Sequence, residues 1–421
     1  MSAEQLMRLN VCLLNDSFPP VVDGVANAVK NYADIINEKF GNAMVVAPAY
    51  PDAQDDYGYP VVRYQSFNTE KLVGYRTGNP LAGGVLGKVG EFAPDILHLH
   101  CPFASAYIAM MAREVTEAPI VYTYHTKFDI DIARTVKMKS LREPSIKAIV
   151  SNISACDDVW VVSKGAGENL RGLGFDGEYT VMENGVDFPR GKAEGARIDA
   201  INKRHALTSA DIPVFLFTGR LMWYKGIDII ISALKMLHDA GEDFRMIFVG
   251  SGLEEDEIKK SVKKHGIGEK CIFTGSISDR EELRAYFSRA DMFVFPSTFD
   301  TNGIVVREAA ACGTPSALIE GSCAAEGVAD SVDGYLIKND PSSLYELLKR
   351  ACANLAGVHE VGKNAMNDLY ISWEDSVTRA YERYIYVYEK FTGMRKNSAV
   401  KRGKVAQTMA EMLENMDKNK R

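Results

Sequence analysis

The sequence predicts an α/β protein with two doubly wound parallel sheets, one in each half of the chain. Strand-like runs alternate with helical-length segments along most of the 421 residues. The runs are apolar throughout rather than alternating, which is typical of parallel strands covered by helices on both faces. The rhythm breaks once, near residue 190, and then restarts. A chain of this length is also too long to fold around a single hydrophobic core.

In the first half we expect strands at residues 9–14, 44–47, 96–100, 120–124 and 159–162. In the second half we expect them at 214–218, 246–249, 271–274, 292–295 and 316–319. The predicted domains are therefore 1–190 and 191–372. A helix at 373–391 is expected to return toward the N-terminal domain, followed by a basic amphipathic tail at 392–421.

The net charge of −7 gives no general electrostatic basis for nucleic-acid binding. No segment reaches the roughly 18 consecutive apolar residues of a membrane span, and the N-terminus lacks the apolar stretch of a secretory signal. The seven cysteines are scattered without the paired spacing of disulfides or zinc sites. We therefore expect a cytoplasmic protein with reduced cysteines.

The most informative motif follows the strand-like run 293–295, where a helix is expected to start near Asn302 or Gly303. Its free N–H groups, at Gly303, Ile304 and Val305, would form an anion site. Asp300 precedes the helix and would lie near whatever is attached beyond the phosphates. Glu308, one and a half turns into the helix, can accept two hydrogen bonds from a ribose diol. Taken alone, the two carboxylates equally fit a helix cap and a solvated side chain.

A second loop, after the run 214–218, carries Arg220 and Lys225 at the carboxyl end of a strand, where ligands bind in such sheets. A diphosphate leaving group needs two or more cations when no metal is supplied. Gly250 and Gly275 follow two further strands and allow close approach of a ligand to the backbone. The sequence has no Walker A motif and no full dinucleotide fingerprint.

Taken together, Gly219-Arg220 … Lys225-Gly226, Gly250-Ser251-Gly252, Phe273-Thr274-Gly275 and Asp300-x7-Glu308 resemble the retaining glycosyltransferases of family 4 in order and spacing. The resemblance implies the GT-B fold, two Rossmann-like domains facing each other across a cleft. It further implies that residues 1–190 form the acceptor-side domain and residues 191–372 the nucleotide-sugar-binding domain. It covers nearly the whole chain, from residue 9 to about 391. The family signature is Glu-x7-Glu, so Asp300 is one methylene shorter than usual.

The same resemblance implies roles for the N-terminal half. Asp23-Gly24 stands where the family usually has Gly-Gly facing the donor phosphates, a variant seen in members that glycosylate lipids. His125 follows a strand and would face the transferred sugar. His98 and His100 share one face of a strand. We expect His100 on the acceptor side and no zinc site, because no third ligand is evident.

The predicted site residues fall into three overlapping groups. The expected catalytic residues are His125, Arg220, Lys225 and Asp300. The expected donor-binding residues are Gly24, Arg220, Lys225, Gly250, Gly275, Asp300, Asn302, Gly303, Ile304, Val305 and Glu308. Asp23, His100 and His125 are expected on the acceptor side.

The resemblance implies transfer with retention from a nucleotide-sugar donor, without a metal or other cofactor. UDP-glucose is favoured, because Asp300-Thr301-Asn302-Gly303 looks like the Glu-Thr-Gln-Gly of lipid glucosyltransferases. Three alternatives stay open. They are a soluble or glycan acceptor with another donor such as GDP-mannose, a nucleotide-sugar 2-epimerase, and a non-catalytic sugar-binding subunit.

Local charge predicts that the protein acts on a lipid acceptor at an anionic membrane surface. We therefore expect the protein to be peripheral on the inner face of the cell membrane. Residues 127–147 hold six basic and three acidic side chains, and residues 390–421 hold nine and three. Val405, Met409, Met412, Leu413 and Met416 fall at helical spacing in that tail. A basic amphipathic helix can lie in an anionic interface. A solvated tail, or a helix that pairs with another protein, is the alternative.

Overall fold

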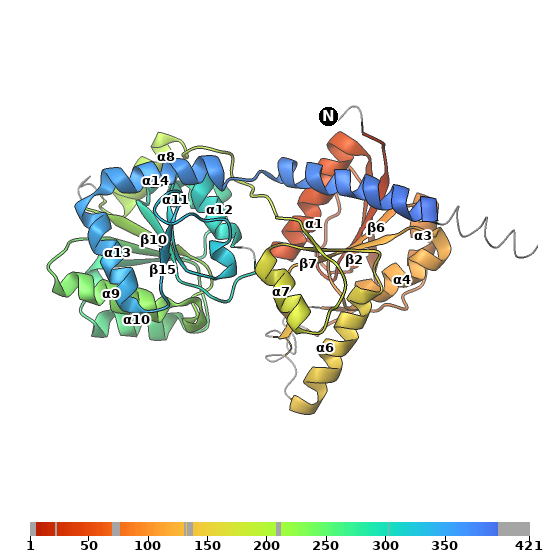
Figure 1. The fold of residues 1–421 in the computed structure, drawn as a ribbon, viewed down its shortest axis with the longest axis horizontal. Coiled ribbons are helices and arrows are strands. Elements are labelled where there is room, and N and C mark those ends of the chain that lie inside the picture. The colour runs from red at the N-terminus through yellow and green to blue at the C-terminus, as the bar shows by residue number, and fades with distance from the viewer. Residues whose placement is uncertain are drawn as a thin grey trace, which may run out of the picture.

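A computed structural model describes residues 6–21, 23–69, 76–129, 132, 138–207, 212–301 and 303–394. These residues form two α/β lobes, and a long helix near the C-terminus extends from the second lobe along the first (Figure 1). Each lobe is built on a parallel sheet whose neighbouring strands are joined by crossovers. The predicted fold class, two doubly wound Rossmann-like sheets, is confirmed.

The N-terminal sheet has seven parallel strands in the order β3-β2-β1-β6-β7-β8-β9. Their bounds are β1 Asn10–Leu14, β2 Asn42–Pro48, β3 Val61–Tyr64, β6 Ile96–Leu99, β7 Ile120–Tyr124, β8 Asp158–Val161 and β9 Thr180–Val181. A short antiparallel pair, β4 Ser66–Phe67 and β5 Thr77–Gly78, stands apart from this sheet. The helices are α1 Gly24–Ile35, α3 Val85–Phe92, α4 Ala104–Thr116, α6 Lys139–Ser154 and α7 Lys164–Gly172, with a π-helical turn η2 at Ile36–Phe40.

The C-terminal sheet has six parallel strands in the order β12-β11-β10-β13-β14-β15. Their bounds are β10 Val214–Thr218, β11 Arg245–Val249, β12 Cys271–Gly275, β13 Met292–Phe295, β14 Ser316–Ile319 and β15 Tyr335–Ile337. The helices are α8 Gly195–Arg204, α9 Ile227–Asp239, α10 Glu255–Lys264, α11 Arg280–Arg289, α12 Ile304–Ala311, α13 Pro341–Ala353 and α14 Leu355–Asp368. Short 3₁₀ turns lie at η3 Trp223–Lys225, η4 Gly268–Lys270 and η5 Cys323–Ala325.

Sequence reasoning missed the short strands β3, β9 and β15 and the β4–β5 pair. The physical reason is their partial burial. β3 alternates buried and half-buried positions, β9 has only two residues, and β15 is half-buried at two of its three positions. None of them presents the continuous apolar run that marks a central parallel strand.

The strand order places a ligand crevice in each lobe. The direction of winding reverses between β1 and β6 in the first sheet and between β10 and β13 in the second. In doubly wound sheets, ligands bind beside this reversal, at the carboxyl ends of the strands. The predicted site residues Arg220, Asp300 and His100 follow β10, β13 and β6, so they lie at these reversals.

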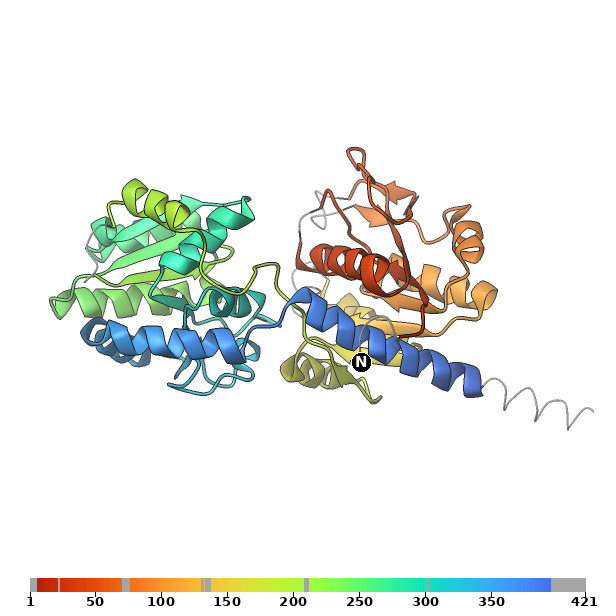
Figure 2. The same cartoon turned by 90° about the horizontal axis from the view of Figure 1, so that it is seen from above.

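The helix at 373–394 belongs to the N-terminal core although it follows the C-terminal lobe in sequence (Figures 1 and 2). Trp373, Val377 and Tyr384 are buried in one cluster with residues of β1 and α1. The hydroxyl of Tyr381 accepts a hydrogen bond from the N–H of Leu9 at 2.7 Å. Within the described part of the chain, no helix is both long enough and apolar enough to cross a membrane.

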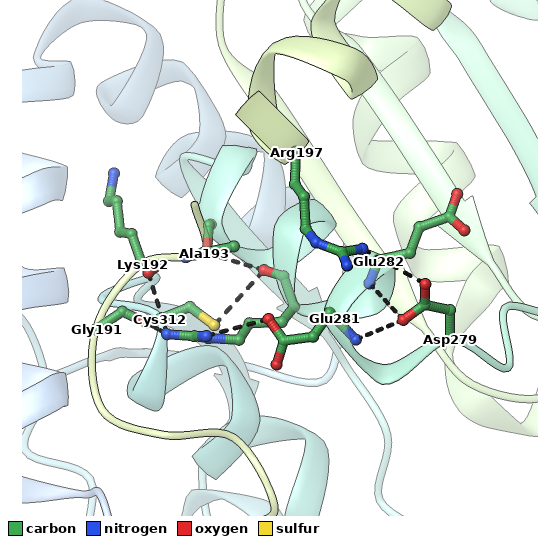
Figure 3. Close-up of polar contacts among 10 residues, drawn as sticks. Gly191, Lys192, Ala193, Arg197, Asp279, Glu281, Glu282 and Cys312 are labelled. Atoms are coloured by element: carbon green, nitrogen blue, oxygen red, sulfur yellow. Dashed lines mark hydrogen bonds and ion pairs between the residues drawn. The ribbon is translucent and has the colours of Figure 1, made fainter. Parts of the chain in front are cut away.

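The segment after residue 190 is hydrogen-bonded to the second lobe (Figure 3). Arg284 of α11 donates from Nη2 to the carbonyl oxygens of Gly191 and Lys192, at 2.9 and 3.1 Å. The N–H of Ala193 donates to Ser288 Oγ at 2.8 Å. These contacts fix where the chain enters the C-terminal lobe.

Two glycines of the second sheet are required for different reasons, which gives a matched pair of substitutions. Gly250 has φ +132°, and a Cβ there would lie 2.0 Å from the carbonyl oxygen of Gly219. Gly275 has φ +74° and open space around the Cβ position. Gly250→Ala is therefore expected to lower the free energy of unfolding by at least about 3 kcal/mol, from overpacking added to backbone strain. Gly275→Ala is expected to cost about 1–2 kcal/mol, from strain alone. Urea unfolding of both variants checks this, and equal midpoints would contradict the packing argument.

Candidate functional site

A cavity of about 620 Å³ lies between the lobes. Its lining residues include Asp23, Gly24, His100 and His125 from the first lobe, and Arg220, Lys225, Asp300 and Ile304 from the second. The structure thus brings eight of the predicted site residues to one space. They come from segments that are far apart in sequence and meet because both strand-order reversals open onto the cavity.

Lys225 is a buried cation held in a fixed position. The residue is 6% exposed, and its Nζ lies 2.6 Å from Asp300 Oδ1. Ser297 Oγ donates to the other carboxylate oxygen of Asp300, also at 2.6 Å. The rings of Phe295 and Phe299 lie 5.6 and 5.5 Å from Nζ, within cation–π range. The ammonium is therefore pre-positioned, and Asp300 is its counter-ion.

The helix α12 offers a second positive element at the same cavity. Its N-cap is Gly303, at φ +55°, and no side chain among the described residues caps the helix. A Cβ at Gly303 would lie 2.9 Å from the Cα of Ala324, so only glycine fits there. The first N–H groups of a helix have no partners within the helix and favour anions. Ile304 lines the cavity and Arg220 is exposed beside it, which makes this edge suited to a phosphate.

Glu308 is buried, with only 5% of its surface exposed, whereas the sequence alone equally fitted a solvated helix residue. Arg280 Nη2 donates to Glu308 Oε1. Burial raises the pKa of the Glu308 carboxyl, and the neighbouring Arg280 opposes that shift. Glu308 is outside the cavity lining, and a ribose would have to share its carboxylate with Arg280. Its assignment to the ribose stays a prediction.

The opposite wall of the cavity carries neutral histidines. His100 Nδ1 and His125 Nε2 form a hydrogen bond of 3.0 Å. Burial lowers the pKa of His125 to about 3, and burial also lowers the pKa of His100 well below its usual value. Both rings are therefore uncharged at neutral pH. Within the described ranges, no three His, Cys, Asp or Glu side chains are grouped so as to hold a metal ion.

Asp23 and Gly24 begin the helix α1 at the cavity edge. Asp23 Oδ1 accepts hydrogen bonds from the N–H groups of Val25 and Ala26, both at 2.8 Å, so it is the N-cap. A Cβ on Gly24 would meet nothing within 4 Å. Protein packing therefore does not require glycine at this position, and the role of Gly24 in donor binding stays a prediction.

The remaining predicted residues lie outside the lining of this cavity or outside the described residues. Gly250 and Gly275 stand at the carboxyl ends of β11 and β12 but are outside the cavity lining, as is Val305. Gly303 lines a small neighbouring cavity instead. Asn302 lies outside the described residues.

Sequence reasoning missed three residues that connect the lobes at the site. Thr301 Oγ1 donates to the carbonyl oxygen of His125 at 2.7 Å, and Ser163 Oγ donates to the carbonyl oxygen of Thr301. The carboxylate of Glu326 accepts the N–H groups of Lys164 and Gly165, at 2.7 and 2.6 Å. Ser163 gives a local signal as a helix cap. The pairings themselves join residues more than a hundred positions apart, so no local pattern could reveal them.

Two facing doubly wound lobes with cations at the shared cavity are the arrangement of the GT-B fold. Sequence models of two families match the chain, "Glycosyltransferase Family 4" over residues 22–190 and "Glycosyl transferases group 1" over residues 199–368. Together they cover most of the chain. The protein belongs to the glycosyltransferases of family 4 and is a hexosyltransferase.

Relatives and a solved structure agree with this assignment. The chain is 26% identical to the sulfoquinovosyl transferase SQD2 of Arabidopsis thaliana over 70% of its own length, which spans only 56% of that protein. It is 27% identical to the phosphatidyl-myo-inositol mannosyltransferase of Mycobacterium tuberculosis, over 89% of this chain and 94% of that protein. Sucrose-phosphate synthase from Thermosynechococcus elongatus has the same fold, with a TM-score of 0.73 at 20% identity, over 91% of this chain and all of that chain.

Removing either cation is expected to lower turnover strongly. Losing one preorganised contact to developing charge typically costs about 10²–10³ in kcat. We therefore expect reductions of this size in Lys225→Ala and Arg220→Ala, measured by sugar transfer from the donor. Arg220 is exposed, so its variant separates lost catalysis from lost folding. Lys263→Ala, on the exposed surface of α10, is the matched control and should be unaffected. Wild-type kcat in both site variants would refute the assignment.

Proposed function

We propose that the protein transfers glucose from UDP-glucose to a diacylglycerol-type membrane lipid, with retention of configuration and without a metal ion. One observation carries the proposal furthest: Arg220, Lys225 and the uncapped N-terminus of α12 converge on a single cavity. Such a group fits a diphosphate, because it combines two cations with free N–H donors.

The chemistry follows from where these charges lie. The bond between the anomeric carbon and the β-phosphate oxygen breaks, and a bond to the acceptor oxygen forms on the same face of the sugar. The departing phosphate oxygen takes the proton of the acceptor hydroxyl. Arg220, Lys225 and the α12 N-terminus stabilise the charge that builds on the diphosphate. These groups supply positive charge that a metal provides in other enzymes, which is why we propose a metal-independent reaction.

The two carboxylates are proposed to divide the donor between them. Glu308 would bind the ribose, and Asp300 would position the sugar next to Lys225. Asp300 is one methylene shorter than the family's glutamate, and both of its oxygens are hydrogen-bonded within the protein. Sugar binding therefore has to share Asp300 with Lys225 and Ser297.

This division predicts different effects for the two isosteric substitutions. Glu308→Gln removes a charged acceptor and is expected to weaken UDP binding about tenfold. Asp300→Asn frees Lys225 from its counter-ion, so UDP affinity should stay or rise while kcat falls. Calorimetric titration with UDP and initial-rate measurements separate the two. Equal UDP affinity in wild type and Glu308→Gln would remove Glu308 from the ribose site.

A lipid acceptor is supported by the surface of the first lobe. The helix α6 projects away from that lobe (Figure 1). At its start Met138 and Leu141 are 63% and 49% exposed, beside the basic residues Lys139 and Arg142. Apolar and basic side chains together suit an anionic interface. Arg134 and Lys137 of the predicted basic segment, and the amphipathic tail beyond residue 394, lie outside the described residues. The relative whose name includes phosphatidyl-myo-inositol adds support, because that name denotes a lipid.

The decisive assay uses anionic liposomes that contain diacylglycerol, with UDP-glucose or GDP-mannose as the donor and EDTA present throughout. We expect an α-linked glycolipid from UDP-glucose, since retention preserves the donor's configuration. Flotation should recover the full chain with these vesicles, and less of it at high salt or after truncation at residue 391. Transfer only to a soluble acceptor without flotation would overturn the lipid proposal, and rescue of EDTA-inhibited enzyme by Mg²⁺ would overturn the metal-free one.

A further inference from the structure

The hydrogen bond between His100 and His125 has only two possible arrangements of its proton. Either His100 Nδ1 carries the proton and donates to His125 Nε2, or His125 Nε2 carries it and donates to His100 Nδ1, over the 3.0 Å separation. Burial lowers the pKa of both rings, so each is neutral and holds a single ring proton. Fixing the proton of one ring therefore fixes the tautomer of the other.

The surroundings of His100 distinguish the two arrangements. Its other nitrogen, Nε2, is buried and has no hydrogen-bond partner among the described residues. If His125 donated, His100 would carry its own proton on this isolated Nε2. If His100 donates from Nδ1, Nε2 is left with only an unused lone pair. Buried N–H groups without a partner are rarer than under-satisfied acceptors. The second arrangement is therefore favoured.

His100 is itself held tightly. Its ring lies 3.9 Å from that of His98, centroid to centroid, and the edge of Tyr32 packs against it at 5.5 Å. His98 is fixed in turn by Thr123 Oγ1, at 2.7 Å from Nε2, and by the hydroxyl of Tyr384 on the long C-terminal helix. His100 therefore has little freedom to turn over and exchange its nitrogens.

We propose that His100 is a positioning residue that fixes His125 in the Nδ1–H tautomer, so that His125 donates a hydrogen bond from Nδ1 to a hydroxyl of the bound sugar. His125 lines the cavity, and Nδ1 is the ring nitrogen left for a ligand. The sugar contact rests on the proposed transfer function, whereas the tautomer does not. In this role His100 acts through His125 and does not contact the acceptor directly.

The tautomer of His125 can be measured directly by NMR. Protonated and unprotonated ring nitrogens differ widely in ¹⁵N chemical shift, and the chain has only seven histidines to resolve. Long-range ¹H–¹⁵N spectra of the free, ¹⁵N-histidine-labelled protein, with His125→Gln to assign the signal, should show His125 protonated on Nδ1. Protonation on Nε2 would overturn the proposal. Because no substrate is present, this result is independent of whether UDP-glucose is the donor.

Two nearly isosteric variants test the coupling. His100→Asn places an amide N–H close to the position of Nδ1–H and should keep the His125 tautomer, whereas His100→Leu offers no donor and should shift the proton toward Nε2. In metal sites, losing the hydrogen bond that orients a ligating histidine typically costs about 10–100-fold in activity. We expect a kcat loss of this size in His100→Leu with little change in the KM of the donor, and partial recovery in His100→Asn.

Calorimetry with UDP shows whether each variant is folded and competent to bind. An unchanged His125 spectrum in His100→Leu overturns the positioning role. Equal kcat in folded His100→Leu and His100→Asn overturns the sugar contact. If the wild-type spectrum and its change are as expected but no nucleotide sugar supports transfer, the proposed function fails and the assignment of the tautomer stands.

Discussion

The two connections between the lobes run beside each other and are hydrogen-bonded together. Val186 N–H donates to the carbonyl oxygen of Ile371 at 3.0 Å, and Val186 forms a bridge with Ser372. Gly185 lies so close to this second connection that a Cβ would sit 2.3 Å from the backbone nitrogen of Trp373. Both lobes contribute to the cavity, so its geometry depends on this paired crossing. Trp373 then begins the helix that completes the N-terminal core.

The two walls of the cavity carry different polar groups. On the C-terminal lobe, Lys225 is buried against Asp300, and the uncapped N-terminus of α12 lies nearby. On the N-terminal lobe, His100 and His125 are held uncharged by burial. The cations Arg220 and Lys225 thus lie on the C-terminal side, whereas Lys127, Asp16 and Asp23 line the N-terminal side together with the two histidines. Uncharged imidazoles can make directional hydrogen bonds.

Thr301 shows how the loop before α12 serves both lobes. It follows Asp300 directly, and its hydroxyl donates to the backbone of His125 in the other lobe. Movement of the lobes would therefore change the separation of Asp300 and His125, the two residues expected to face the sugar. Glu326 acts on the same boundary, because it caps the N-terminus of α7 from across the lobes. These contacts join the two lobes at the site.

The sequence alone determined the fold class, the central strands and the start of α12. Each of these is written in local patterns: continuous apolar runs for strands buried on both faces, and glycine at Gly303 and Gly313 around a short helix. The order and spacing of motifs from Arg220 to Glu308 was enough to predict the family. The edge strands β9 and β15 were not predicted, because short half-buried segments have no such pattern.

Only the tertiary structure decided which side chains touch. It paired Lys225 with Asp300, Glu308 with Arg280 and His100 with His125, across 75, 28 and 25 positions respectively. It also buried all three pairs wholly or in part, and burial lowers the pKa of both histidines and raises that of Glu308. The physical reason is that a hydrogen bond needs its two atoms within about 3 Å in a defined direction. Spacing along the chain does not encode that proximity, which arises when parallel strands bring their carboxyl ends to the same edge of a sheet.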